Sequence, residues 1–255
     1  QAGQLVVFGL LTDPQQVGTA SRDMLARANR PIFERFARAI AAARPQHPPI
    51  VIVVSNPVEL GVHIFSRYLP RENVIGMGAY SDSLRFRWEI AHDLGIGRQR
   101  VHGYVLGEHG DGMVPLWSSV RVYGTTAAEW RTVEKRLRGD LGTTDFPARL
   151  VEERNRLIQM LADDPIHYTD AKTVEATSHA VVELITAIVA GRPMEIAAQY
   201  QHEGESGIHG PFGARLIVAG QVDRLLPIEG YWREETDLLY QAAENIQVKI
   251  AEWCS

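Results

Sequence analysis

The histidine at position 109 stands in a turn whose composition suits proton transfer. An apolar run over 104–106 leads into Gly-Glu-His-Gly-Asp at 107–111, so carboxylates of Glu108 and Asp111 flank the imidazole. The two glycines allow backbone conformations closed to other residues, and we expect the turn to present His109 rather than bury it. Imidazole exchanges protons near neutral pH, which makes His109 a candidate general acid and base. The alternative is a hairpin whose histidine is a solvated bystander.

Asp82 and Arg85 lie three residues apart at the start of an expected helix and share one of its faces. One interpretation is a surface ion pair, which contributes about 0.3 kcal/mol and no function. The functional interpretation assigns Asp82 to His109, where it would orient the imidazole and stabilise its charged form. Arg85 would then bind a substrate carboxylate, because a planar guanidinium can form two parallel hydrogen bonds with it.

Arg22 follows Thr-Ala-Ser at 19–21, a plausible helix N-cap, and would occupy the first turn of a helix. A cation is mildly unfavourable there, which favours another role, such as polarising a carbonyl; an ordinary solvated arginine is the alternative. Asn56 follows an expected strand over 50–54. Ligands of open α/β sheets bind at such carboxyl ends, although Asn56 also fits a turn before Pro57.

The apolar pattern predicts the elements that position these residues. We expect strands over 5–8, 50–54 and 73–76, with helices over 22–40 and 58–68 between them; Pro31 would break or kink the first helix. This alternation is typical of a parallel sheet with crossover helices. Later in the chain we expect helices near 81–94, 126–137, 146–162 and 170–189, strands within 101–122 and over 215–219 and 221–226, and a last helix with Leu239, Ala242, Ile246, Ile250 and Trp253 on one face.

Composition and charge exclude several classes of function. The chain has 255 residues, of which 45% are hydrophobic, enough for a buried core. A formal net charge of −5 without long charged runs argues against a nucleic-acid partner. The single cysteine, Cys254, excludes an internal disulfide, and we expect no metal site. No apolar run reaches about 18 residues, and no signal peptide is recognised, so we expect a cytoplasmic protein without a membrane span.

Three motifs in register resemble the lactate/malate dehydrogenase family. They are Ser-Asn-Pro-Val at 55–58, Val-Ile-Gly-Met-Gly followed by Asp-Ser-Leu-Arg-Phe-Arg within 74–87, and Gly-Glu-His-Gly-Asp at 107–111. Their order and spacing agree with the family throughout. The resemblance extends from the loop that ends at Arg22 to the final helix, and so covers essentially the whole chain.

The resemblance implies an α/β fold in two parts. Residues 1–80 would form the C-terminal half of a dinucleotide-binding domain, a partial Rossmann-type parallel sheet, and residues 81–255 a mixed α/β catalytic domain. The implied reaction is hydride transfer between NAD and a small 2-hydroxy acid of the lactate or malate type. A symmetric homo-oligomer is also expected.

The resemblance also assigns roles to residues. His109 would take the hydroxyl proton with help from Asp82, Arg85 would hold the substrate carboxylate, and Arg22 would polarise the carbonyl from a closing loop. The remaining assignments are Asn56, Thr173 and Gln16 to the substrate, and Gly9, Val54 and Asn56 to the cofactor.

The sequence departs from the family pattern near its start. The Gly-x-Gly-x-x-Gly phosphate loop would precede Leu5, where only four residues stand. We therefore expect an N-terminal segment missing from the sequence, or a partner subunit, to cover the edge of the strand over 5–8. Gly-Leu-Leu-Thr at 9–12 replaces a small glycine-containing turn. The loop before Arg22 is one residue longer than usual, so Pro14, Gln15 or Gln16 fills the substrate-selecting position; a glutamine would favour a neutral substrate such as lactate.

Two hypotheses follow. The first is an NAD-dependent 2-hydroxy-acid dehydrogenase, supported by the joint presence of His109, Asp82, Arg85, Arg22 and Asn56. The second is a catalytically silent family member that serves as a structural or regulatory subunit of a larger assembly. The missing phosphate loop supports the second.

Overall fold

The first part of the fold is a parallel sheet with crossover helices, as the sequence predicts. The computed structural model describes residues 5–8, 21–43, 46–139, 172–228 and 230–255. Strands β1 (Leu5–Phe8), β2 (Ile50–Val53) and β3 (Val74–Gly76) pair in parallel in that order. Helix α2 (Arg22–Ala42) precedes β2, and α3 (Val58–Ser66) connects β2 to β3. All four residues of β2 are buried, which explains why its sequence is continuously apolar.

The sheet continues into an antiparallel part. Strand β3 pairs with β6 (Met194–Glu203) at Gly76 and Gln199, and β6 pairs along its whole length with β7 (His209–Val218). Strands β4 (Val101–Gly107) and β5 (Met113–Val122) form a hairpin that joins β7 at Gly107. A short strand, β8 (Val222–Leu225), pairs with the far end of β7. Within the described residues one sheet thus runs β1-β2-β3-β6-β7-β4-β5, and a domain division near residue 80 stays a prediction.

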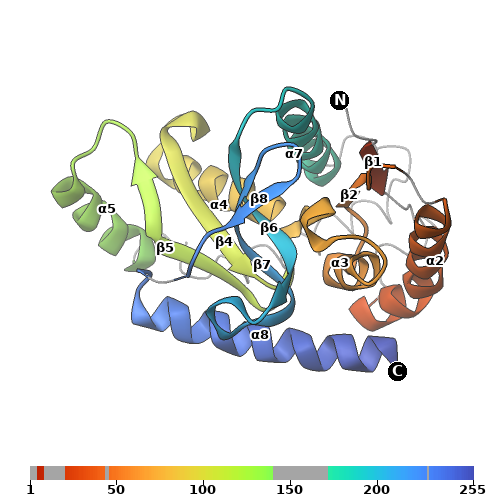
Figure 1. Ribbon diagram of the computed structural model, residues 1–255. Helices are drawn as coiled ribbons and strands as arrows, with labels where there is room; N and C mark the ends of the chain where they lie inside the picture. The colour runs from red at the N-terminus through yellow and green to blue at the C-terminus, as the bar shows by residue number, and fades with distance from the viewer. Residues whose placement is uncertain (1–4, 9–20, 44–45, 140–171, 229) are drawn as a thin grey trace, which may run out of the picture.

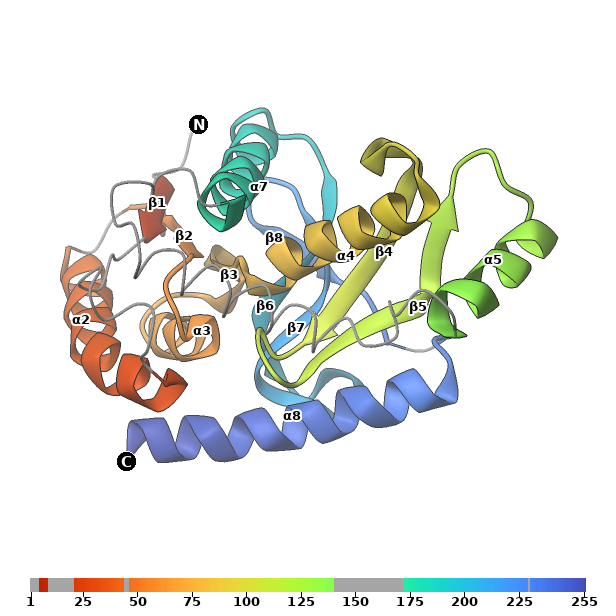
Figure 2. The ribbon, with the colours of Figure 1, turned by 180° about the vertical axis from the view of Figure 1, so that it is seen from behind.

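Helices cover both faces of this sheet (Figures 1 and 2). Helices α2, α3 and α8 (Arg233–Cys254) share one apolar core, which includes Phe33, Phe65 and Ile246. Helices α4 (Gly78–Leu94) and α7 (Lys172–Val189) share a second with β6, and α4 also contributes to a third with β4 and β5. Helix α5 (Ala127–Gly139) lies beside β5. In the described part of the chain, short 3-10 helices at Arg71–Asn73, Arg98–Arg100 and Glu205–Gly207 connect these elements.

Four points in the predicted elements need correction or remain open. Pro31 does not end its helix, because α2 runs through it and packs Ala26, Phe33 and Ala37 into the core on both sides. Strand β6 is absent from the predictions, since its alanines and glutamates have low β-propensity. The strand expected over 215–219 begins earlier, at His209. The helix expected over 146–162 lies outside the described residues.

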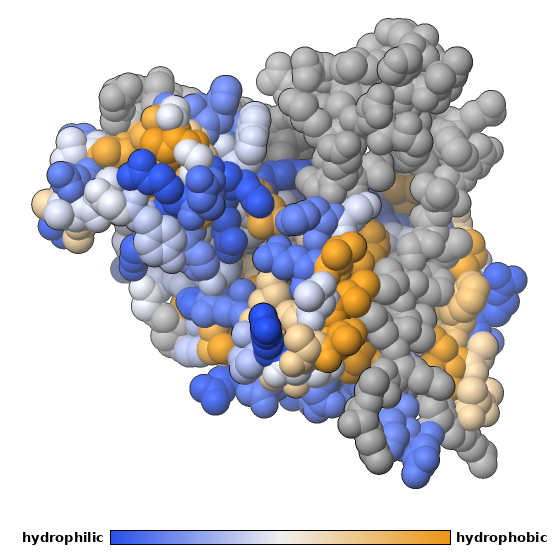
Figure 3. All heavy atoms as spheres, turned by 90° about the horizontal axis from the view of Figure 1, so that it is seen from above, coloured by the Kyte–Doolittle hydropathy of each residue, from blue (hydrophilic) through white to orange (hydrophobic). Residues whose placement is uncertain are grey.

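Helix α7 exposes part of its apolar surface. Its Ala180 and Leu184 are fully buried against the sheet, whereas Val182 and Val189 face solvent. Figure 3 views the molecule from the side on which α7 lies in Figure 1, and shows a hydrophobic area bordered by hydrophilic side chains. None of the described helices combines the length and the hydropathy needed to cross a membrane.

Candidate active site

Asp82 lies in the buried N-terminal half of α4. Two contacts fix this half against the sheet: the Ala79 N–H donates to Gln199 Oε1 on β6 at 3.0 Å, and the Val105 N–H of β4 donates to Ser83 Oγ at 2.9 Å. The side chain of Asp82 is completely buried, which argues against a mere surface ion pair. Instead, its Oδ2 lies 2.7 Å from Nδ1 of His109.

The turn between β4 and β5 carries His109. Gly107 opens it with a φ of 89°, and a Cβ at this position would lie 2.6 Å from the Gly112 carbonyl oxygen, so the close turn requires glycine. Gly78 lies against the histidine from α4, where an added Cβ would come within 2.4 Å of His109 Cβ. The imidazole is therefore held by backbone contact as well as by Asp82, and it is neither solvated nor fully buried.

Arg85 faces the same aspartate from one helical turn further on. Its Nη1 lies 3.8 Å from Asp82 Oδ1, at the long end of ion-pair distances. That oxygen is buried and has no hydrogen-bond partner among the described residues. The guanidinium is partly exposed, so it can offer donors to a second carboxylate.

Arg22 reaches the histidine turn from the start of α2. Ser21 caps this helix, with its Oγ accepting the Met24 N–H at 3.2 Å, as the sequence predicts. The Arg22 guanidinium lies directly against Gly110, because a Cβ added there would be 2.3 Å from Arg22 Cζ. Its Nη1 lies 3.3 Å from Oε1 of the buried Glu108.

Glu108 and Asp111 do not serve His109 directly. Glu108 turns away and accepts hydrogen bonds from Lys249 Nζ of α8, at 2.7 Å to Oε1 and 2.9 Å to Oε2. Asp111 is exposed. Sequence reasoning missed Lys249; its signal is a cation placed three residues after Ile246 and directly before Ile250, at the border of the apolar face of the last helix.

Glu59 is a second residue that sequence reasoning missed. It lies in the first turn of α3, and its Oε1 accepts the backbone N–H of His109 at 2.6 Å. Burial raises the pKa of the Glu59 carboxyl, while the positive charges of Arg22 and His109 lower it. The available signal is an acidic residue in the first turn of an otherwise apolar helix, a position that usually indicates only helix stabilisation.

For the other predicted site residues, the structure shows fewer contacts or none. Asn56 is exposed three residues before Glu59, and its carbonyl oxygen accepts from Asn29 Nδ2 at 2.6 Å. Val54 is half-buried directly after β2. Thr173 lies at the start of α7. Gly9 and Gln16 lie outside the described residues.

Comparison with known proteins bears on this geometry. The protein-family model for the lactate/malate dehydrogenase α/β C-terminal domain matches residues 81–221 of the sequence, more than half of the chain. The chain belongs to the lactate/malate dehydrogenase family. The malate dehydrogenase of Sorangium cellulosum is 30% identical to it over 95% of this chain and 72% of that protein.

Two further proteins of the lactate/malate dehydrogenase family are similar to parts or most of this chain. The L-lactate dehydrogenase of Deinococcus radiodurans is 35% identical over 54% of this chain, and the match spans about half of that protein, 47%. The lactate dehydrogenase of Cryptosporidium parvum, solved with lactic acid and NAD, superposes with a TM-score of 0.73 over 93% of this chain and 72% of that chain. At 24% identity, this likeness shows the fold.

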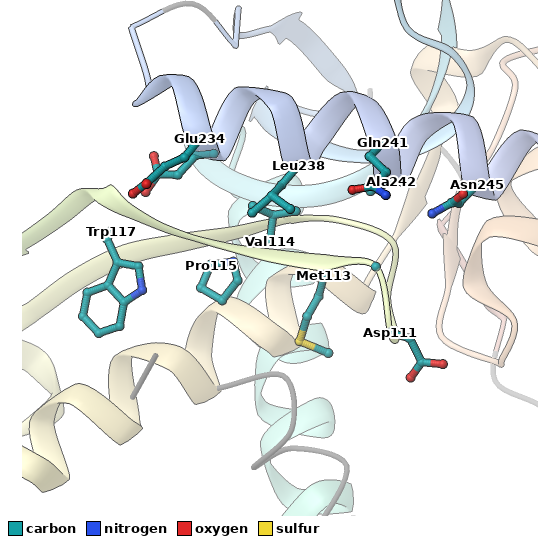
Figure 4. Close-up of a pocket in the computed structure, with 12 residues that line it drawn as sticks. Asp111, Met113, Val114, Pro115, Trp117, Glu234, Leu238, Gln241, Ala242 and Asn245 are labelled. Carbon is teal, nitrogen blue, oxygen red and sulfur yellow. The ribbon is translucent and has the colours of Figure 1, made fainter. Parts of the chain in front are cut away.

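A groove of about 580 Å³ between β5 and α8 is separate from the residues that this family resemblance assigns. Figure 4 shows α8 above it, with Leu238 pointing down toward Val114 and Pro115. His109 does not line the groove, although Asp111, two residues later, does. Among the described residues no group of three histidine, cysteine or acidic side chains could hold a metal ion.

Proposed function

We propose that this chain is an oxidoreductase that transfers a hydride between NAD(H) and a small 2-hydroxy or 2-keto acid. The contact between Asp82 and His109 carries the proposal, because it joins a buried carboxylate to an accessible imidazole at 2.7 Å. The Arg85 guanidinium lies near Asp82, and the Arg22 guanidinium lies against Gly110, the residue after His109. A proton carrier with two cations suits an anionic substrate whose oxygen gains and loses charge.

His109 acts as the base in oxidation and as the acid in reduction. Asp82 accepts from Nδ1, which leaves Nε2 for the substrate. In oxidation Nε2 takes the hydroxyl proton while the C–H bond breaks and its electron pair leaves with the hydride. The resulting imidazolium forms next to the buried Asp82 carboxylate, which stabilises its charge.

The two arginines divide the substrate between them. Arg85 binds the carboxylate, since its guanidinium is only loosely held at 3.8 Å from Asp82. Arg22 polarises the carbonyl oxygen, whose negative charge develops next to a preorganised cation. In reduction, His109 then supplies the proton that completes the hydroxyl group.

The described residues fit the nicotinamide end of NAD. Val54 offers an apolar wall and Asn56 an exposed amide, both just beyond the carboxyl end of β2, where open α/β sheets bind ligands. When bound there, NAD would supply the hydride acceptor for oxidation, and NADH the hydride donor for reduction. Gly9, the third residue assigned to the cofactor, lies outside the described residues.

The substrate side chain is expected to meet Pro14, Gln15 or Gln16. A neutral glutamine at that position favours a substrate without a second carboxylate, of the lactate type. The ratio of kcat/KM for pyruvate to that for oxaloacetate tests this expectation, and a ratio well below one would assign the chain to the malate type.

We also propose that this protein works as an assembly, either a homo-oligomer or a complex with a partner subunit. Strand β1 pairs with β2 on one side and, within the described residues, with no strand on the other. An apolar edge of this kind favours a covering segment. Native mass spectrometry tests the proposal, and a monomer at micromolar concentration contradicts it.

Turnover and cofactor binding together test the proposed reaction. In a fluorescence titration, we expect NADH to bind the protein with micromolar affinity. We also expect the protein to oxidise NADH when pyruvate or oxaloacetate is added. His109→Asn should keep NADH binding and lose turnover by on the order of 10²- to 10⁴-fold. No binding at millimolar NADH would support the alternative of a catalytically silent subunit.

A further inference from the structure

We propose that Lys249 of α8 is a positioning residue of the active site that keeps Arg22 available to the substrate. The inference rests on the proposed function, in which Arg22 polarises the substrate carbonyl. Lys249 acts through Glu108 and does not touch the histidine or the arginine in any contact observed among the described residues.

Lys249 and Arg22 compete for one buried carboxylate. The side chain of Glu108 is 1% exposed, and its Oε1 receives both Lys249 Nζ at 2.7 Å and Arg22 Nη1 at 3.3 Å. Lys249 also reaches Oε2 at 2.9 Å. The lysine thus makes the two shorter contacts with Glu108, and the arginine makes one longer contact.

The charges explain why this competition matters. The Glu108 carboxylate faces two cations, Arg22 and Lys249, and the Glu59 carboxyl lies close enough to Arg22 to interact with its charge. A guanidinium has five N–H donors, and Arg22 uses one of them on Glu108. Without Lys249 the buried Glu108 charge would have Arg22 as its remaining partner, because an uncompensated buried charge is strongly unfavourable. Arg22 would then be held at Glu108 and would be less available to the substrate.

The C-terminal end of α8 is fixed at the helix that carries Arg22. Trp253 Nε1 donates to Oδ1 of Asp23 at 2.8 Å, and Arg30 Nη1 of α2 donates to the Ser255 carbonyl oxygen at 2.7 Å. Lys249 lies one turn before Trp253. Figures 1 and 2 both show this end of α8 next to α2. The fold therefore positions Lys249 relative to Arg22 through contacts that do not depend on Glu108.

Chemical modification of Arg22 tests the inference without any enzyme assay. We expect phenylglyoxal to modify Arg22 about tenfold more slowly in Lys249→Met than in the wild type, as followed by peptide mass spectrometry. Glu108→Gln should speed the reaction, and the double variant should match Glu108→Gln. Arg233→Gln removes an exposed cation from the same helix and should leave the rate unchanged. The proposal would be overturned if Lys249→Met left the modification rate of Arg22 unchanged. It would also be overturned if Lys249→Met slowed the reaction equally in the wild type and in Glu108→Gln.

Kinetics then separate positioning from folding. We expect Lys249→Met to lower kcat for 2-keto acid reduction about tenfold, to keep KM for NADH, and to melt within a few degrees of the wild type. Lys249→Arg should restore kcat, since it returns a cation to Glu108. A kcat unchanged by Lys249→Met contradicts the proposal. A wild-type protein without turnover would refute the proposed function instead, while the Arg22 modification rates would still decide the role of Lys249.

Discussion

Asp82 Oδ2 lies 2.7 Å from His109 Nδ1, and the two side chains differ in their access to solvent. The aspartate is completely buried, whereas 17% of the histidine side chain is exposed. The imidazole is thus held from its buried side and presented on its open side. The contact also joins α4 to the turn between β4 and β5, so the two side chains meet only when α4 packs against the sheet.

Asp82→Asn should keep the shape of this contact and lose its charge. The amide oxygen can still accept from Nδ1, but no anion then stabilises the imidazolium. We expect kcat for 2-keto acid reduction to fall by on the order of 10²-fold or more, measured with NADH at saturation. Asp237→Asn, at an exposed aspartate of α8, is the matched control. Equal rates for Asp82→Asn and the control would remove Asp82 from the mechanism.

Glu59→Ala should destabilise the protein more than Glu59→Gln. The alanine variant leaves the partly buried N–H of His109 without its acceptor, at a cost of about 1–3 kcal/mol, whereas the glutamine variant keeps an acceptor oxygen. Because burial raises the pKa of Glu59, ionisation lowers the stability of the folded wild type as pH rises above the usual glutamate range. Urea unfolding of the wild type and both variants at pH 5 and pH 8 checks both points, because Glu59→Gln should lose only the part of the pH dependence that comes from Glu59. Identical unfolding of the two variants would contradict the first.

The sequence predicts a helix or strand best where the spacing of its apolar residues and the length of the apolar segment indicate the same type of element. The four buried residues of β2 and the apolar face of α8 are both predicted from pattern alone. Strand β6 is not, because its place between β3 and β7 comes from pairing with distant residues rather than from its own composition. A proline within α2 is tolerated for a similar reason, since tertiary packing holds the helix on both sides of it.

The same distinction holds for the candidate site. His109, Asp82 and Arg85 stand in short motifs whose residue types indicate chemistry directly, and the fold brings them together. Glu59 and Lys249 carry no such motif. Their partners lie 50 and 141 residues away in the sequence, so only the folded chain shows that both contact the histidine turn.

Gly110→Ala should reduce activity while it preserves the fold. The added Cβ would lie 2.3 Å from Arg22 Cζ and force the guanidinium away. The displaced atoms are the end of a flexible side chain, so we expect a melting temperature within a few degrees of the wild type. We expect kcat for 2-keto acid reduction to fall at least tenfold. Gly191→Ala is the control: its φ of 61° makes an alanine strained, so it should lower the melting temperature, but no heavy atom lies within 4 Å of the added Cβ and kcat should stay at the wild-type value. A fully active Gly110→Ala variant would contradict the role of Arg22.

His202 should make the protein less stable as pH falls from about 6.5 to about 4. Burial lowers the pKa of His202 to about 4; Arg71 and His209 also lower it, and Glu205 opposes them. The unfolded chain takes up a proton at the usual histidine pKa near 6.5, so between these values it binds more protons than the folded chain. The resulting loss approaches about 3 kcal/mol at the acid end. Urea unfolding across this range checks it: His202→Phe should flatten the pH dependence, and His92→Gln, at an exposed histidine, should not. Parallel curves for wild type and His202→Phe would show that another group controls acid stability.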